Sequence, residues 1–225
     1  MNRSRASLAL TVAFALAAVL GQGEAHGFGR NKPGEFDYYA LVLGWAPTYC
    51  QSEGNLRKEG ECDVRMPHAF VLHGLWPQYE RGWPEDCPTG TRPWVPNGVI
   101  ADMRDIMPSK GLIIHEYRTH GTCSGLDPQQ YFGVTRELYD RVKVPDDLLA
   151  PSAQISLSAE EIERQFTAAN PWLKPEMISI SCRGTNLLDI RVCFGRDLFP
   201  RSCGPNEEQR RLCSSSQIIV PPVRH

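Results

Sequence analysis

The sequence lacks two features that would point to a membrane or to broad nucleic-acid binding. No apolar run after residue 20 approaches the roughly 20 residues that a transmembrane helix needs. The formal net charge of the 225 residues is −2, whereas proteins that coat nucleic acid are usually strongly basic. Any nucleic acid would therefore be bound at a local site. Repeats, low-complexity tracts and linkers are missing too, so about 200 residues beyond the N-terminal segment predict one domain.

Closely spaced cysteine pairs are also missing, which argues against a zinc site built from Cys-x-x-Cys. The 8 cysteines are even in number and all follow the N-terminal segment. In an exported chain this pattern predicts four disulfides, with about 105 pairings open from the sequence alone.

The N-terminal segment has the features of a secretory signal peptide. Arg3 and Arg5 precede an apolar run at residues 8–20, and the small residues Gly23 and Ala25 follow it. The run is short for a membrane span. We expect residues 1–25 to be removed and residues 26–225 to form an exported domain, secreted or periplasmic, with no membrane anchor.

The order of apolar patterns favours the α+β class, because strands and helices mix without a regular β-α-β rhythm. Apolar and aromatic runs predict strands at residues 36–45, 177–181 and 187–194. In the last of these we expect Leu188, Ile190 and Val192 to point inward. A shorter apolar run, residues 69–72, leads directly into His73.

Helix starts are marked by capping residues. Asp127 followed by Pro128 predicts an N-cap with proline at the first helical position. Ser158 and Glu161 form a capping box, and the apolar stripe after them ends at Asn170.

Three of the 6 histidines fall in two unusual segments, HGLWPQY starting at His73 and HEYRTHGTCSG starting at His115. If the second segment is α-helical, the side chains of His115, Glu116, Thr119 and His120 span an arc of roughly 140° and line one wall. Glu116 and His120 are then close enough to touch.

Glycine and proline beside these side chains are expected to shape the backbone. Gly121 suits the exit of the second helix. Gly74 and Pro77 are expected to form a turn that presents His73 and Trp76.

Three interpretations of the histidines compete. Any single histidine is more often an ordinary polar or core residue, which accounts for His26, His68 and His225. A zinc hydrolase would place histidines at i and i+4 around the glutamate, whereas His115 and His120 are five apart and no third ligand is evident. Paired acid/base catalysis accounts best for the cluster, because imidazole titrates near neutrality and can both take and give a proton.

Together, HGLWPQY and HEYRTHGTC resemble the two signature segments of the ribonuclease T2 family, His-Gly-Leu-Trp-Pro and His-Glu-(Trp or Tyr)-x-Lys-His-Gly-Thr-Cys. Residues 39–50, Cys182 and residues 187–203 resemble further parts of that family, so the likeness covers most of the mature chain. It implies one disulfide-stabilised domain with a central, mainly antiparallel sheet flanked by helices. The active site would be a cleft between the two segments.

The resemblance also implies a function. The protein would be an endoribonuclease that cleaves single-stranded RNA with little base specificity and without a metal or other cofactor. DNA would be inert because it lacks the 2′-OH. We expect a monomer.

Site roles follow from the same resemblance. His120 would take the proton of the ribose 2′-OH and His73 would protonate the leaving 5′-oxygen, giving a 2′,3′-cyclic phosphate that water opens to a 3′-phosphate. Glu116 would orient the catalytic histidine, and His115 would hold a phosphate oxygen. Trp76 would stack on a base; core packing is its alternative.

Two predicted substrate-binding positions depart from the family. Thr119 stands where the family usually has lysine, and losing a cation there would slow the reaction by a factor of order 10². Gln78 stands where some members have an acidic residue that contacts the base, so we expect little base preference. The alternative function is a secreted binding or signalling protein on the same scaffold, with weakened activity.

The family's disulfide pattern would tie the loop after the His73 segment to the exit of the His120 helix. The implied pairs are Cys50–Cys62, Cys87–Cys123, Cys182–Cys213 and Cys193–Cys203.

Overall fold

The computed structural model describes residues 31–53, 60–63 and 65–223. The predicted signal peptide at residues 1–25, His26 and His225 lie outside the described residues. In the part that is described, no helix has the length and apolar character needed to cross a membrane.

One mainly antiparallel sheet of six strands organises the described residues, as predicted. Its strands are β1 (Tyr38–Trp45), β2 (Phe70–Gln78), β3 (Ile155–Leu157), β4 (Ile178–Arg183), β5 (Asn186–Gly195) and β6 (Ile218–Val220). The order is β2-β1-β5-β6-β3, and β4 also pairs with β5. The pairing of β5 with β6 is parallel and consists of Asn186 opposite Ile219. Strand β2 therefore forms one edge of the sheet.

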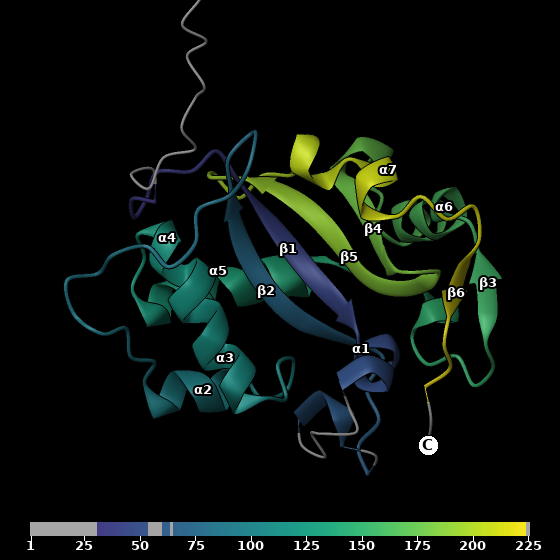
Figure 1. The fold of residues 1–225 in the computed structure, drawn as a ribbon, viewed down its shortest axis with the longest axis horizontal. Helices are drawn as coiled ribbons and strands as arrows, with labels where there is room; N and C mark the ends of the chain where they lie inside the picture. The colour runs from purple at the N-terminus through teal and green to yellow at the C-terminus, as the bar shows by residue number, and fades with distance from the viewer. Residues whose placement is uncertain (1–30, 54–59, 64, 224–225) are drawn as a thin grey trace, which may run out of the picture.

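Helices flank the sheet, which confirms the predicted α+β class. They are α1 (Ala46–Glu53), α2 (Asn97–Met103), α3 (Lys110–Glu116), α4 (Thr122–Ser124), α5 (Pro128–Arg141), α6 (Ala159–Ala169) and α7 (Gln209–Leu212). Figure 1 shows α3 and α5 beside β1 and β2, with α2 packed against α3 and α5, and α6 and α7 beside β4.

Both predicted helix starts are confirmed. The Asp127 side chain accepts the backbone N–H of Gln130, whose side chain in turn accepts the N–H of Asp127. Ser158 and Glu161 make the same reciprocal pair at the start of α6. Each box satisfies two backbone donors that a helix end otherwise leaves without partners.

The hydrophobic core lies on the sheet face that carries the odd-numbered residues of β1. Leu41 and Leu43 are buried there with Ile190, Val192 and the helix residue Phe166. A side chain in a strand alternates between the two faces, so the even-numbered residues of β1 belong to the opposite face.

The expectation that Leu188 points into this core was wrong. Ser181 lies opposite Asp189 and Cys182 opposite Leu187, so Leu188 is an extra residue that bulges out of the pairing. Leu187 is fully buried in its place. Leu188 instead lines a cavity on the opposite face.

The predicted turn at Gly74 and Pro77 was also wrong, because β2 continues through both residues to Gln78. Proline is tolerated in β2 because this strand is at the sheet edge, where a missing N–H breaks no ladder. The outer edge of β2 is closed by a side chain. The Tyr131 hydroxyl of α5 donates to the carbonyl oxygen of Leu75 at 2.8 Å and lies 3.4 Å from the Leu75 nitrogen.

We expect Tyr131→Phe to lower the free energy of unfolding by about 1–3 kcal/mol, because it leaves buried backbone groups of Leu75 without a partner. Urea denaturation followed by circular dichroism measures this loss. Tyr139→Phe, on the same helix, is the control and should leave the stability unchanged. Equal stability of the two variants would contradict the role of the Tyr131 hydroxyl.

Candidate active site

A cavity of about 670 Å³ lies over the sheet face opposite the core. Strand β1 contributes small residues to this face, with Val42 opposite Arg191 and Gly44 opposite Asp189 of β5. The cavity is lined by His73, Trp76, His115, Asp189 and Arg191, among others.

His73 reaches the cavity through a bulge in β2. Val42 pairs with Gly74 and Leu43 pairs with Leu72, so His73 has no partner on β1. A bulge of this kind redirects the side chain of the extra residue. The His73 side chain is 40% exposed and faces the second histidine segment.

The second segment is not a regular α-helix. Helix α3 passes into a π-helical turn, Tyr117–Gly121, before α4. A π-turn holds an extra residue and is frequent at functional sites. Here it leaves Glu116 buried beside β2, while His115 is exposed at the cavity.

The expectation that Gly121 ends the helix was wrong, because the helical segment continues to Gly125, whose φ is +77°. Gly121 is needed for space instead. A Cβ at this position would lie 2.4 Å from Cδ2 of Tyr117 and 3.1 Å from Cδ1 of Tyr131.

The Glu116 carboxyl is the centre of the site and is 1% exposed. Its Oε1 lies 3.5 Å from Nε2 of His73, and its Oε2 lies 4.0 Å from Nε2 of His120. Oε2 also accepts a 2.8 Å hydrogen bond from Nε1 of Trp76. Burial raises the pKa of Glu116 to about 8, partly opposed by the Trp76 hydrogen bond. One carboxyl thus joins two histidines from different segments.

Gly74 makes room for this carboxyl, a requirement that sequence reasoning missed. A Cβ at position 74 would lie 2.1 Å from Oε2 of Glu116 and 2.9 Å from Nε1 of Trp76. The strand must therefore carry no side chain where the helix presents its carboxylate.

The two histidines have different environments. Burial lowers the pKa of His120 to about 3, helped by the nearby His73 and His115 rings. The side chain of His120 is 12% exposed, and within the described residues its buried Nδ1 has no hydrogen-bond partner. Burial also lowers the pKa of His73, while Asp189 opposes this shift. His73 keeps more contact with water, so its charged form is better hydrated. Such a difference suits a neutral base at His120 and an acid at His73.

Trp76 holds the two histidines in place. Its ring stacks on His120 with centroids 5.0 Å apart and meets His73 edge-on at 5.2 Å. The guanidinium of Arg191 lies over the same indole, 5.1 Å from the centroid. The indole therefore contacts Glu116, both histidines and Arg191.

The structure does not bring Gln78 or Thr119 to the cavity lining. Gln78 is 3% exposed and accepts a hydrogen bond from Asn206, because the segment around Asn206 covers that end of the sheet face. The backbone carbonyl of Thr119 accepts the N–H of Asp86 at 2.8 Å. Asp189 and Arg191, which sequence reasoning missed, do line the cavity. Their alternation with Ile190 and Val192 was the signal of a polar strand face.

All four implied disulfides are present: Cys50–Cys62, Cys87–Cys123, Cys182–Cys213 and Cys193–Cys203. The second one ties the loop after β2 to α4, directly behind the π-turn. This bridge and the Asp86 hydrogen bond fix the second histidine segment to the loop that follows the first one. Over the described ranges, no group of three or more His, Cys, Asp or Glu is arranged to hold a metal ion.

Comparisons with known proteins agree with this arrangement. The sequence model described as the ribonuclease T2 family matches residues 36–203. A ribonuclease of Aeromonas hydrophila is 37% identical over 119 residues, which is 53% of this chain and 52% of that protein. A probable ribonuclease of Haemophilus influenzae is 30% identical over 187 residues, covering 78% of this chain and 64% of that protein. The chain thus spans between half and two thirds of these two relatives.

Solved structures share the fold. The S-like ribonuclease trichomaglin superimposes with a TM-score of 0.68 at 24% identity, covering 85% of this chain and all of that one. An RNase-related protein from Calystegia sepium has a TM-score of 0.66 at 21% identity.

We expect Gly74→Ala to destabilise the protein by about 1–3 kcal/mol, because the added methyl group overpacks against Glu116. Gly98→Ala in α2 is the matched control: its Cβ would meet nothing within 4 Å, and alanine in a helix is favoured by about 0.5–1 kcal/mol. Thermal unfolding of both variants measures the difference. A Gly74→Ala protein as stable as the wild type would show that Glu116 does not need this space.

Proposed function

The chain belongs to the ribonuclease T2 family, and from this premise we propose that it is an endoribonuclease. Its substrate is single-stranded RNA, which it cleaves without a metal and with little base specificity. The observation that carries the proposal is the buried Glu116 carboxyl, which lies 3.5 Å from His73 and 4.0 Å from His120. Because the 2′-OH of RNA is itself the nucleophile, two histidines that move protons are sufficient for the reaction.

In the first step His120 takes the proton of the 2′-OH, and O2′ forms a bond to phosphorus. The bond from phosphorus to O5′ breaks, and His73 gives its proton to O5′. The products are a 2′,3′-cyclic phosphate and a free 5′-OH. Water then opens the cyclic phosphate to a 3′-phosphate, with the two histidines exchanging roles.

Glu116 has a positioning and charge-balancing role in this scheme. Its raised pKa favours the neutral carboxyl while His120 is neutral. When His120 becomes charged, a cation about 4 Å away favours ionisation of the carboxyl, so that the buried imidazolium is paired. A buried charge without such a partner would be strongly disfavoured.

His115 and Trp76 are the substrate-binding residues of the proposal. His115 is exposed at the cavity and holds a phosphate oxygen. Trp76 also lines the cavity and is assigned to stack on a base, although His120 already stacks on its ring.

We assign no substrate contact to Gln78, which is 3% exposed and accepts a hydrogen bond from Asn206, or to Thr119. His120 is also outside the cavity lining, but it lies next to it, stacked on the Trp76 ring and 4.0 Å from the Glu116 carboxyl.

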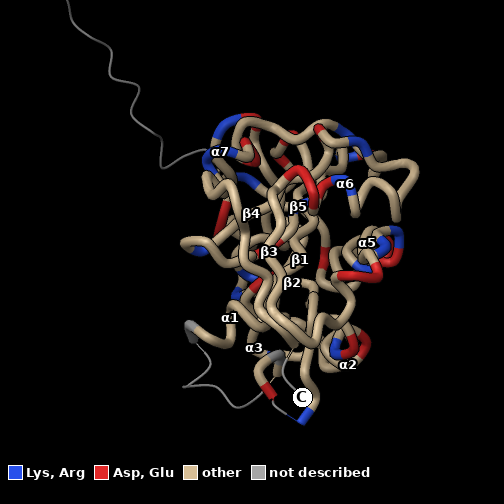
Figure 2. The backbone as a smooth tube through the Cα atoms, turned by 90° about the vertical axis from the view of Figure 1, so that its right-hand side faces the viewer, with Lys and Arg blue, Asp and Glu red and all other residues tan. Residues whose placement is uncertain are grey.

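Export is part of the same proposal. Four disulfides in the described residues suit an oxidising compartment, either outside the cell or in the periplasm. The net charge of −2 and the interspersed acidic and basic residues in Figure 2 agree with RNA bound at a local cavity rather than along a basic face.

The wild-type protein should cut single-stranded RNA in excess EDTA, leave DNA intact and produce 2′,3′-cyclic ends. His73→Ala and His120→Ala should each lower kcat by at least about 10²-fold, because each removes an acid/base group. His68→Ala, which changes a histidine outside both histidine segments, is the control and should retain activity. Gel analysis of a labelled RNA and mass spectrometry of its ends give the result. A folded but inactive wild type would favour the alternative, a secreted binding or signalling protein; inhibition by EDTA would favour a metal-dependent hydrolase.

The protein should work best in acid. Activity needs neutral His120, so kcat/KM should rise as the pH passes upward through about 3. It also needs protonated His73, so kcat/KM should fall as the pH passes upward through the lowered pKa of His73, below its ordinary 6.5. A pH–rate profile on a dinucleotide measures both limbs. An optimum above neutrality would contradict the assignment of His73 as the acid.

A further inference from the structure

We propose that Arg191 binds a phosphate of the RNA substrate and supplies the positive charge that the family usually places at the position of Thr119. The inference rests on the proposed function, and it adds a residue on the sheet to a site whose other members come from the two histidine segments.

The first argument is position. Arg191 lines the same cavity as His73 and His115. Its guanidinium lies 5.1 Å from the centroid of the Trp76 ring, and that ring contacts both catalytic histidines. The charge of Arg191 is also close enough to His73 to lower its pKa. A phosphate held between the two histidines is therefore within the field of this cation.

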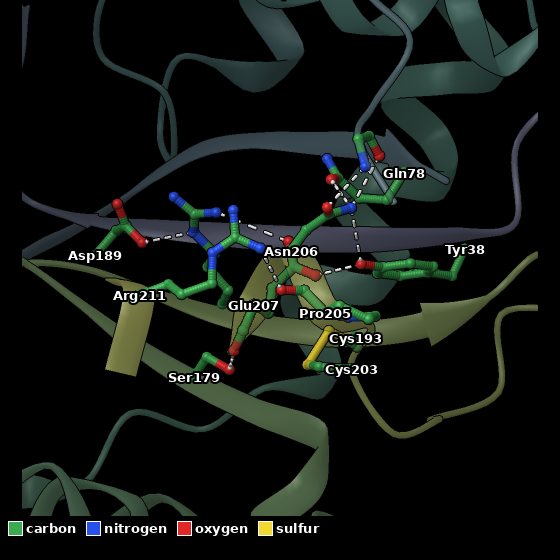
Figure 3. Close-up of polar contacts among 12 residues, drawn as sticks. Tyr38, Gln78, Ser179, Asp189, Cys193, Cys203, Pro205, Asn206, Glu207 and Arg211 are labelled. Atoms are coloured by element: carbon green, nitrogen blue, oxygen red, sulfur yellow. Dashed lines mark hydrogen bonds and ion pairs between the residues drawn. A yellow bond between two sulfur atoms is a disulfide. The ribbon is translucent and has the colours of Figure 1, made fainter. Parts of the chain in front are cut away.

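The second argument is the way Arg191 is fixed. Its Nε donates to Oδ1 of Asp189 at 3.0 Å, and its Nη1 lies 3.7 Å from Oε1 of Glu207. Both carboxylates are buried, at 3% and 2% exposure. Glu207 is itself held, because its Oε2 accepts the Tyr38 hydroxyl and its backbone carbonyl accepts Oγ of Ser179 (Figure 3). The guanidinium thus has a fixed direction before any substrate arrives.

The third argument is that the Arg191 guanidinium has N–H donors left for a ligand. Within the described residues, Nε is the atom of Arg191 that donates a hydrogen bond, and no residue accepts one from Nη2. A guanidinium presents five N–H groups in a planar fork that matches phosphate oxygens. The edge away from Asp189 is therefore suited to a phosphate at the cavity surface.

Other cations near the site are less suited. Arg118, next to Thr119, turns to the loop and donates from Nε to the carbonyl of Pro93. Arg183 lines the cavity but lies opposite Asn186, five residues along β5 from Arg191. Because Leu188 bulges out of the pairing, four residues of β4 span this stretch, so the two backbones are roughly 13 Å apart at about 3.3 Å per strand residue. This distance suits another part of an RNA chain rather than the reacting phosphate.

The test compares Arg191→Gln with Arg118→Gln, which removes the cation next to Thr119 and serves as the control. We expect Arg191→Gln to lower kcat/KM on a dinucleotide by about 10²-fold and to weaken inhibition by inorganic phosphate by about tenfold or more. Arg118→Gln should match the wild type in both measurements. Arg191→Lys should give values between those of the wild type and of Arg191→Gln, because an ammonium keeps the positive charge but lacks the planar set of N–H donors of a guanidinium.

Folding is controlled separately, since Arg191→Gln leaves two buried carboxylates without their cation. If that variant unfolds, the double variant Arg191→Gln with Asp189→Asn carries the test, because it removes both charges of the pair together. A folded variant without Arg191 that retains wild-type kcat/KM and phosphate inhibition overturns the inference and leaves the proposed function standing.

A wild type that folds but does not cleave RNA would overturn the proposed function instead. Calorimetric titration of inorganic phosphate then decides the inference: loss of phosphate affinity in the Arg191 variant supports the phosphate site, and unchanged affinity overturns it.

Discussion

The structure depends on a carboxyl group placed where water cannot reach it. Glu116 is 1% exposed, and a buried carboxyl is tolerated only with polar partners around it. Those partners come from β2: Nε1 of Trp76 at 2.8 Å and Nε2 of His73 at 3.5 Å. Gly74 lies between them and contributes no atom beyond its backbone, because a Cβ would fall 2.1 Å from the carboxyl oxygen. The HGLW segment can therefore be understood as the surface against which one glutamate packs.

Bringing that carboxyl to β2 requires two departures from regular structure. The bulge at His73 turns its side chain toward the helix, and the π-turn Tyr117–Gly121 places Glu116 and His120 against the sheet. Irregular backbone leaves groups without ladder partners, and specific contacts satisfy them. The Thr119 carbonyl accepts the N–H of Asp86, and the Tyr131 hydroxyl bonds the backbone of Leu75. The neighbouring Cys87–Cys123 disulfide ties these parts together.

Local signals in the sequence were sufficient for most of the fold. Capping residues at Asp127 and Ser158 marked two helix starts, and the strand patterns located β1, β4 and β5, because these features depend on neighbours in the chain. The disulfide pairs followed from resemblance. The errors concern features set by distant contacts: the bulge that buries Leu187 instead of Leu188, and the space that Gly74 leaves for the distant Glu116 carboxyl. The alternation around Arg191 marked a polar strand face, but only the pairing of β5 with β1 and of β1 with β2 brings Arg191 beside Trp76.

In the proposed reaction, the distribution of charge around the site suits the division of roles between base and acid. On the helix side the His120 side chain is 12% exposed, and burial lowers its pKa to about 3. On the sheet side His73 is 40% exposed and is influenced by Asp189 and Arg191 with opposite signs. A cation on the helix at position 119 would lie beside His120 and depress its pKa further. A cation on β5 acts on the substrate from across the indole of Trp76 and is paired with Asp189, so its charge is balanced before the substrate binds. A positive charge at Arg191 on β5, instead of at position 119 on the helix, would therefore still attract the phosphate. It would also leave the difference between the environments of His120 and His73 unchanged.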